Sequence, residues 1–127
     1  MSSTKEFRIS LPNQPGQLVR VCEALSQRNV NIRTIAGIAG TNRLAMVTDQ
    51  EDPTKEVLQK LGLSFEEVEL LTVRLVDKPG TLAGFARKLA DANINIESIY
   101  RLGVTADGVE VAFTVSDIDK AKPVLGL

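Results

Sequence analysis

The sequence predicts an α+β protein built from two copies of one βαββαβ module. The first observation is an internal repeat, in which residues 11–35 align with residues 75–99 at an offset of 64 positions. The second is that both copies show the same succession of strand and helix patterns around a Pro-Gly pair. Such self-similarity defines the architecture of a whole chain. The identical pairs are Leu11 and Leu75, Pro15 and Pro79, Gly16 and Gly80, Leu18 and Leu82, Leu25 and Leu89, Asn29 and Asn93, Asn31 and Asn95, Ile32 and Ile96, and Ile35 and Ile99.

The chain length favours two small modules. The 127 residues allow about 60 per module, a size at which an isolated domain is marginally stable. We therefore expect domain 1 to span residues 1–69 and domain 2 to span residues 70–127, with the two copies packed against each other.

The composition excludes several classes of partner and chemistry. The 15 Lys and Arg residues nearly balance the 16 Asp and Glu residues, so no basic face for nucleic acid is expected. The absence of histidine and the single cysteine remove the commonest general base, the commonest metal ligand and any internal disulfide. The first residues are polar, and the longest apolar run, residues 68–76, is too short to cross a bilayer. We expect a cytoplasmic protein without metal, cofactor, nucleic-acid or membrane partner.

The first module shows two periodicities in turn. Apolar residues alternate over residues 6–11, which predicts a strand, and recur at helical spacing over residues 17–27. A helix stripe of Leu18, Val21, Cys22 and Leu25 is expected to face the core. Further strands are predicted at residues 30–38, 44–48 and 65–69. Between the last two, Asp52 is expected to cap a short helix that has Pro53 in its first turn and ends at Gly62.

The second module repeats this order with clearer signals. Strands are predicted at residues 71–75, 94–102 and 109–115, and the Asp107-Gly108 pair favours a hairpin turn before the last of them. Leu82, Phe85, Ala86 and Leu89 form the helix stripe. A short helix, limited by Pro123, follows from about Asp117. No segment remains for a fourth strand, so either this copy lacks its last strand and leaves an edge open for a partner, or the sequence is shortened.

A βαββαβ order of this length is the ferredoxin-like arrangement, a four-stranded antiparallel sheet with both helices on one face. Two such modules side by side would form one extended antiparallel sheet with the helices on one face, which would protect sheet edges and stabilise both halves.

The repeated loop is the candidate site for ligand chemistry. Gly80 allows a ligand to approach the backbone, and the amides of Thr81 and Leu82 open a helix and are expected to be unpaired. Asp77 offers an acceptor for an ammonium group, and the Asn95 amide can donate or accept. Together these groups complement the two charged ends of a free amino acid. The first copy offers the same set, with Asn13 for Asp77 and Asn31 for Asn95.

Each of these residues also has a purely structural interpretation. Asp77 and Asn13 could brace a turn or cap a helix, and Pro-Gly could be turn chemistry alone. For Asn29 and Asn93 we favour a left-handed helix cap. For the Asn31 and Asn95 pair, the ligand and structural interpretations are evenly balanced. The sequence shows no glycine-rich phosphate loop, cysteine pair or serine with a base partner, so an enzyme is not expected.

The two motifs resemble those of the ACT domain. The first copy has Asn13-Gln-Pro-Gly-Gln-Leu18 followed by Asn29-Val-Asn-Ile32, and the second has Asp77-Lys-Pro-Gly-Thr-Leu82 followed by Asn93-Ile-Asn-Ile96. The Pro-Gly element alone is weak, but its pairing with the asparagine motif, twice at one spacing, is fairly specific. The resemblance covers nearly the whole chain and identifies it as a stand-alone tandem ACT protein.

The resemblance implies regulatory binding of small molecules, most often amino acids, at the seam between two units. One site would combine Asn13, Pro15, Gly16, Gln17 and Leu18 with Asn95. The other would combine Asp77, Pro79, Gly80, Thr81 and Leu82 with Asn31. It further implies a metabolic enzyme or transcription regulator as partner, and a homodimer. The alternative is a structural assembly subunit that keeps the fold without a ligand.

Overall fold

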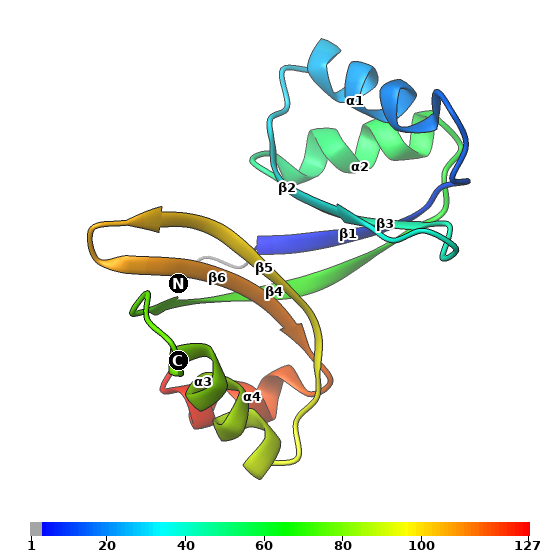
Figure 1. Ribbon diagram of the computed structural model, residues 1–127. Coiled ribbons are helices and arrows are strands. Elements are labelled where there is room, and N and C mark those ends of the chain that lie inside the picture. Colours follow the sequence, from blue (N-terminus) through cyan, green and yellow to red (C-terminus); the bar gives the residue numbers. More distant parts are fainter. Residues whose placement is uncertain (1–3) are drawn as a thin grey trace. The chain divides into compact units, whose positions relative to one another are not determined.

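The computed structural model describes residues 4–127, and the chain divides into two compact units. The first three residues of the polar N-terminus and of predicted domain 1 lie outside the described residues. One unit ends at Val68 and the other begins at Glu69. Residues 4–127 form six strands and four helices, which Figure 1 colours in chain order.

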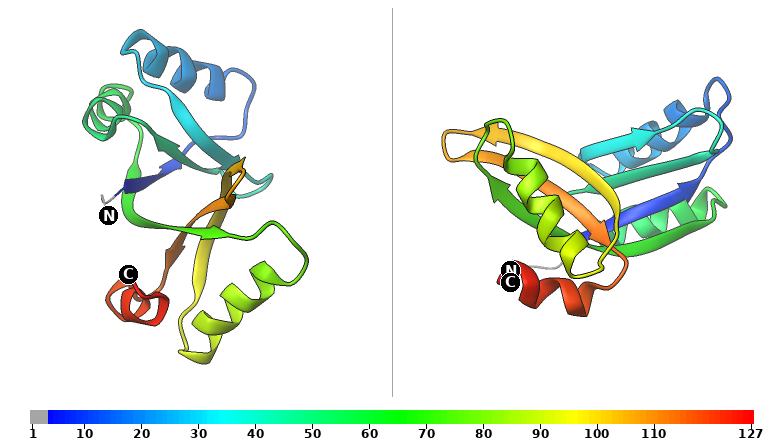
Figure 2. Two further views of the ribbon diagram at one scale, coloured as in Figure 1. Left: turned by 90° about the vertical axis from the view of Figure 1, so that its left-hand side faces the viewer. Right: turned by 60° about the horizontal axis from the view of Figure 1, so that its bottom comes forward.

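The first unit contains the predicted βαββαβ succession. Strand β3 pairs antiparallel with both β1 and β2, and Leu44 of β3 lies opposite Ile9 on one side and Gly37 on the other. The strand order is β2-β3-β1-β4. Both helices lie on one face of these strands (Figure 2). The elements are β1 (Thr4–Ser10), α1 (Gln17–Gln27), β2 (Ile32–Gly37), β3 (Arg43–Thr48), α2 (Glu51–Lys60) and the start of β4 (Phe65–Leu75).

The second unit has the same design from the end of β4 onward. Strand β6 pairs antiparallel with both β4 and β5, so that Val109 lies opposite Leu75 and Val104. The two helices again share one face (Figure 2). The further elements are α3 (Thr81–Asp91), β5 (Ile96–Thr105), β6 (Gly108–Val115) and α4 (Ile118–Leu125). Within residues 4–127 no strand follows α4.

Strand β4 belongs to both units. The sequence predicted separate strands at residues 65–69 and 71–75, but they form one continuous strand, Phe65–Leu75. Its sequence holds no glycine or proline, and these are the residues that interrupt strands. The hydrogen-bonded order of the six described strands is β2-β3-β1-β4-β6-β5. The predicted α+β class, with two modules contributing to one antiparallel sheet, is confirmed.

Each unit buries its own apolar core between helices and strands. In the first unit the fully buried side chains include Phe7, Leu25, Met46 and Leu58. In the second unit the rings of Phe85 and Phe113 meet edge to face, with centroids 4.9 Å apart. The buried residues of this second core are Leu71, Phe85, Leu89, Ile94, Phe113, Val115 and Ala121.

Asparagine ends the first helix of each unit. Asn29 has a φ of 59° and Asn93 a φ of 61°, so both adopt the left-handed conformation. The next residues close the helix end: Val30 N donates to Leu25 O at 3.0 Å, and Ile94 N donates to Leu89 O at 2.8 Å. This is the Schellman arrangement. The expectation of left-handed caps at both asparagines is confirmed.

The start of α2 differs from the prediction. The helix begins at Glu51 with Gln50 as its N-cap residue, so Asp52 lies inside the first turn and is not the cap. The buried hydroxyls of Thr48 and Thr54, 2.8 Å apart, both donate to Gln50 O and hold the entry to the helix. Pro53 lies in the first turn, as predicted. In α4 the predicted start is correct, since Asp117 Oδ1 accepts from Lys120 N at 3.1 Å.

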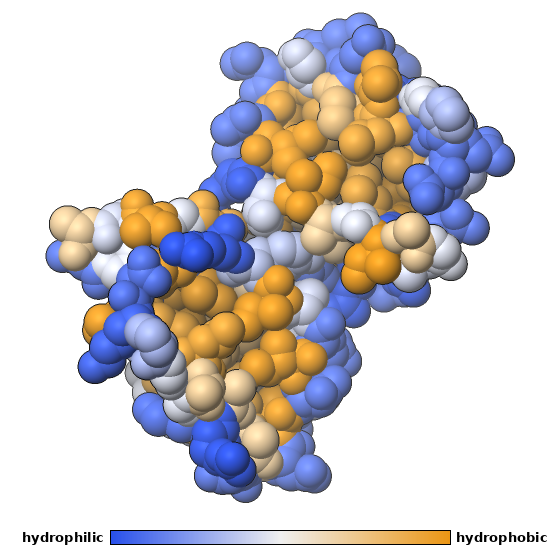
Figure 3. Space-filling model, viewed as in Figure 1, coloured by the Kyte–Doolittle hydropathy of each residue, from blue (hydrophilic) through white to orange (hydrophobic). Residues whose placement is uncertain are grey.

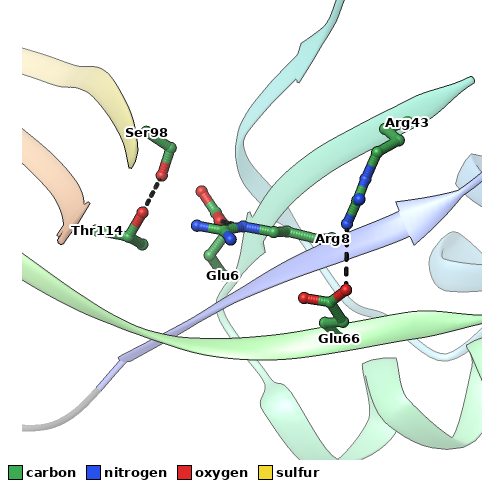
Figure 4. A network of polar contacts seen from close by, with 6 residues as sticks. All are labelled: Glu6, Arg8, Arg43, Glu66, Ser98 and Thr114. Atoms are coloured by element: carbon green, nitrogen blue, oxygen red, sulfur yellow. Dashed lines mark hydrogen bonds and ion pairs between the residues drawn. The ribbon is translucent and has the colours of Figure 1, made fainter. Parts of the chain in front are cut away.

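Figure 4 shows several polar side chains of the strands that pair within their own unit. In the first unit the carboxylate of Glu6 is fully buried and accepts from Arg8 Nε. A buried carboxylate requires such a partner because its desolvation is otherwise costly. In the second unit the hydroxyls of Ser98 and Thr114 form a hydrogen bond between β5 and β6.

Candidate ligand-binding pockets

The Pro-Gly pairs lead directly into α1 and α3. Gly16 and Gly80 are the N-cap residues of these helices, with φ values of 89° and 92°. A Cβ atom at either position would meet no atom within 4 Å. The left-handed backbone is by itself a sufficient reason for glycine at both positions. The open space beside Gly80 is compatible with the ligand approach that the sequence suggests there.

A hollow of about 350 Å³ lies beside the Pro-Gly loop of the first unit. It is bounded by the end of β1, the first turn of α1, the end of β2 and the start of β3. Of the predicted site residues, Asn13, Gln17 and Leu18 line it. The other lining residues are Leu11, Pro12, Gln14, Ile35, Gly37, Ile38, Ala39, Asn42, Arg43 and Leu44.

A second hollow of about 300 Å³ lies at the corresponding place of the second unit. Of the predicted site residues, Asp77, Thr81 and Leu82 line it. The other lining residues are Leu75, Val76, Lys78, Ile99, Tyr100, Arg101, Val109 and Val111. Figure 3 shows apolar side chains gathered on the visible face of each unit. The repeat in the sequence therefore corresponds to a repeated pocket.

The first leucine of each helix stripe, Leu18 or Leu82, lines a pocket. The core-facing place that the stripe predicts for Leu18 is therefore wrong, and both leucines are among the predicted site residues. Leu18 is 47% exposed and Leu82 is 53% exposed, whereas Val21 and Phe85, one turn later, are buried. Helical spacing assigns all stripe residues to one face, but it does not say how far the core extends along the helix. The first turn lies beyond the core.

The charged groups differ between the pockets. In the second pocket an Asp77 carboxylate oxygen lies 3.7 Å from an Arg101 guanidinium nitrogen, and both side chains are 60% exposed. In the first pocket Arg43 is the lining cation, and it forms an ion pair with Glu66 at 3.4 Å (Figure 4). The remaining polar lining of the first pocket consists of the amides of Asn13, Gln14, Gln17 and Asn42.

One residue that lines the second pocket, Thr81, has an unusual hydroxyl environment. Thr81 Oγ1 is buried and has no hydrogen-bond partner among residues 4–127. A buried hydroxyl without a partner costs about 1–3 kcal/mol, so a polar group from a ligand or water at this position would be stabilising. The equivalent residue in the first unit, Gln17, is already engaged, because its Oε1 accepts from Arg20 at 3.3 Å.

The helix-opening amides are only partly available. The amide of Thr81, which the sequence suggested was unpaired, donates to Lys78 O at 3.4 Å, a long bond. The first intrahelical bond runs from Gly84 N to Gly80 O at 3.0 Å. The amides of Leu82 and Ala83 therefore precede it and lie at the positive end of α3.

The strand-start asparagines do not join the loop of their own unit. Residue pairing places Ile32 and Gly37 at opposite ends of β2, so Asn31 lies at the far end from the Pro-Gly loop. Backbone bonds hold both asparagines: Asn31 N donates to Asp49 Oδ1 at 2.9 Å, and Asn95 N donates to Ser116 Oγ at 3.0 Å. Their side chains are exposed. Pro15, Gly16, Pro79 and Gly80 shape the loops without lining the pockets.

Sequence reasoning missed the strand residues that complete each pocket. Ile35 and Ile99 are identical in the repeat and occupy corresponding places, so the repeat contained a signal for them. The sequence contains only a weaker signal that Arg101 lines the pocket. It follows Ile99 by two positions and so lies on the same face of β5.

The described residues lack two further features. Among residues 4–127 no group of three His, Cys, Asp or Glu side chains could hold a metal ion. No helix in the same part of the chain has the length and apolar character needed to span a membrane.

The sequence matches one family of known proteins. The family model described as ACT domain matches twice, at residues 5–62 and at residues 70–123. The two matches fall on the two units and together cover most of the chain. No curated protein matches the sequence significantly.

Solved structures share the fold over nearly the whole chain. A structure from Bacteroides thetaiotaomicron is 23% identical, with a TM-score of 0.83, and the alignment covers 98% of this chain and 87% of that one. The ligand-free regulatory subunit of aspartate kinase from Thermus thermophilus is 22% identical, with a TM-score of 0.65 and coverages of 98% and 88%. The corresponding subunit from Thermus flavus is 21% identical, with a TM-score of 0.66 and coverages of 99% and 90%.

Proposed function

Because this chain belongs to the ACT-domain family, we propose that it is a regulatory protein that binds an amino acid and acts through a separate enzyme or regulator. The matched family is a regulatory, non-catalytic domain type, and it accounts for both units. The observation that supports the proposal best is the pocket that recurs beside the Pro-Gly loop of each unit. Its volume lies at the lower end of the range for small-molecule sites, as a ligand of amino-acid size requires.

The chemistry of the second pocket suits the two ends of an amino acid. Asp77 can accept from an ammonium group. The Thr81 hydroxyl and the amides that open α3 can donate to a carboxylate. Leu82 and the neighbouring strand residues supply apolar surface for a side chain. A ligand bound here would satisfy a buried hydroxyl that otherwise lacks a partner.

The full site set that we propose includes the loop residues and the two strand-start asparagines. Asn95 is proposed to complete the first pocket's site, with Asn13, Gly16, Gln17 and Leu18. Asn31 is proposed to complete the second, with Asp77, Gly80, Thr81 and Leu82. The exposed side chains of both asparagines are consistent with such a role.

Regulation requires that the ligand bind one assembly state better than another. The proposed output is therefore a ligand-dependent association with a metabolic enzyme or a transcription regulator. The Thermus proteins of similar fold are regulatory subunits of aspartate kinase. We propose an arrangement of the same kind here, in which the partner is a separate chain.

We further propose a cytoplasmic homodimer. Strands β2 and β5 stand at the two ends of the strand order, so each has an edge without a partner in that order. Ile35 on β2, Ile99 on β5 and Ile38 just after β2 are exposed, and Ile38 is 73% exposed. Apolar side chains beside a sheet edge favour association with a second chain.

A thermal-denaturation screen against the twenty amino acids tests the proposal. A ligand at about a hundred times its dissociation constant stabilises the folded state by roughly 2.7 kcal/mol, which raises Tm by several degrees. We expect a selective increase with one amino acid or one chemical group of amino acids. An unchanged Tm across the whole panel would contradict an amino-acid ligand.

Two variants test whether an amino acid that raises Tm binds in the second pocket. Thr81→Val removes the buried hydroxyl and is expected to reduce the ligand-induced shift. Arg87→Gln changes an exposed residue of the same helix outside the pocket and serves as the matched control. An equal reduction in both variants would show that the ligand binds elsewhere.

A structural assembly subunit is the second candidate. It is favoured by the first pocket, where exposed apolar residues surround neutral amides. In that case the pocket would receive a partner's side chain. The protein would form its complex equally well with and without amino acids.

A further inference from the structure

The second pocket contains an arginine that the loop motif does not include. Arg101 lies opposite Val111 in the antiparallel pairing of β5 and β6, and residues opposite each other share a face of the sheet. Ile99, two positions earlier, shares that face as well. The pairing shifts register between Arg101 and Gly103, and such an irregularity re-aims the neighbouring side chains. All three residues line the hollow.

Arg101 and Asp77 form a loose pair whose groups are available to a ligand. Their closest atoms are 3.7 Å apart, beyond hydrogen-bond distance, and both side chains are 60% exposed. An exposed pair of this kind contributes little to stability. A zwitterion can therefore insert between them at low cost, with its carboxylate toward the guanidinium and its ammonium toward the carboxylate.

The first unit has uncharged residues at the two equivalent positions of the repeat. Gly37 occupies the place of Arg101 in the repeat, and a Cβ atom there would lie 3.3 Å from the side chain of Leu44. Asn13 occupies the place of Asp77, and its backbone amide donates to Asn42 Oδ1 at 3.1 Å. The first pocket therefore offers no carboxylate for an ammonium group among its lining residues.

The remaining surface of the second pocket is mostly apolar. Leu75, Val109 and Val111 come from paired strands on one face, and Leu82 from α3 lies across from them. Lys78 is the other charged lining residue, and it disfavours a cationic ligand side chain.

From these contacts we propose that Arg101 binds the ligand carboxylate and makes the second unit the site for an α-amino acid with an uncharged, apolar side chain. Asp77 binds the ammonium group, and the apolar wall receives the side chain. The assignment rests on the proposed function and adds the ligand class, the unit and a specificity-determining residue.

Calorimetric titration of the full chain with leucine and two analogues tests it. Leucinamide lacks the carboxylate charge, and 4-methylpentanoate lacks the ammonium group. Wild-type protein is expected to bind one leucine per chain and to bind leucinamide at least tenfold more weakly. Arg101→Gln is expected to weaken the binding of leucine at least tenfold and to abolish the preference for leucine over leucinamide. Asp77→Asn is expected to weaken the binding of leucine and to leave the affinity for 4-methylpentanoate unchanged.

The control is Arg87→Gln, an exposed arginine of α3 outside the pocket, which is expected to bind leucine like the wild type. If Arg101→Gln weakens the binding of leucine and of leucinamide equally, or weakens the binding of neither, the role of Arg101 is overturned. Amino-acid binding itself would still stand. If lysine or glutamate binds more tightly than leucine, valine, isoleucine and methionine, the ligand class is overturned. Binding of no amino acid overturns this assignment and the proposed function together.

Discussion

At the scale of single residues, a few backbone conformations position the pockets. Gly16 and Gly80 open α1 and α3 in the left-handed region, and Asn29 and Asn93 end the same helices in it. The chain therefore enters and leaves each helix at a defined angle. The loop residue three positions before each glycine, Asn13 or Asp77, lines the pocket. The asparagine caps could be predicted from the sequence because Asn is one of the residues that adopt positive φ most readily. The left-handed glycine at the start of each helix is seen only in the structure.

Two glycines of the second unit should respond oppositely to alanine. Gly80→Ala forces a Cβ into a backbone with φ of 92° and is expected to destabilise the protein by about 1–2 kcal/mol. Gly84→Ala lies inside α3 with no atom within 4 Å of the new methyl group, and it is expected to stabilise by about 0.5–1 kcal/mol. Urea denaturation measures both. Equal effects at the two positions would show that φ does not determine the requirement for glycine at residue 80.

At the scale of elements, each helix carries a core-facing part and a pocket-facing part. In α3 the core part is formed by Phe85 and Leu89, and the first turn with Leu82 serves the pocket. The same division holds in α1 between Val21 with Leu25 and the first-turn Leu18. A continuous apolar stripe in the sequence therefore has two different functions along its length.

Leucine-to-alanine substitutions separate these functions within one helix. Leu89→Ala removes a fully buried side chain and is expected to cost about 2–5 kcal/mol of unfolding free energy. Leu82→Ala removes a half-exposed side chain and is expected to cost less than about 1 kcal/mol, while weakening ligand binding. Chemical denaturation and titration of the same two variants provide the comparison. A large stability loss in the Leu82→Ala variant would show that Leu82 contributes to the core.

At the scale of the whole molecule, two units of about 60 residues share one strand. Each has its own core, and a module of this size is marginal alone. Strand β4 is common to both, with β1 and β6 as its neighbours in the strand order. The repeat therefore gives two similar pockets on one continuous backbone, and small substitutions have made their chemistry different.

The proposed homodimer has a direct test at this scale. The double variant Ile35→Lys with Ile38→Lys places charges beside the edge of β2 and is expected to be monomeric, whereas the wild type is expected to be a dimer. Light scattering after size-exclusion chromatography reports the mass of each. Ser26→Lys, on the exposed side of α1, is the control and should match the wild type. A monomeric wild type would contradict the proposal.

The sequence by itself determined the modules, the element order and the loop that borders each pocket. It did so because periodicity, the Pro-Gly pairs and the asparagine caps are local properties of the chain. Only the tertiary structure decided that residues 65–75 form one strand, how far each core extends along α1 and α3, and that Arg101 lies beside Asp77. Strand register and the extent of a core depend on which distant residues pair, and no local pattern encodes that choice.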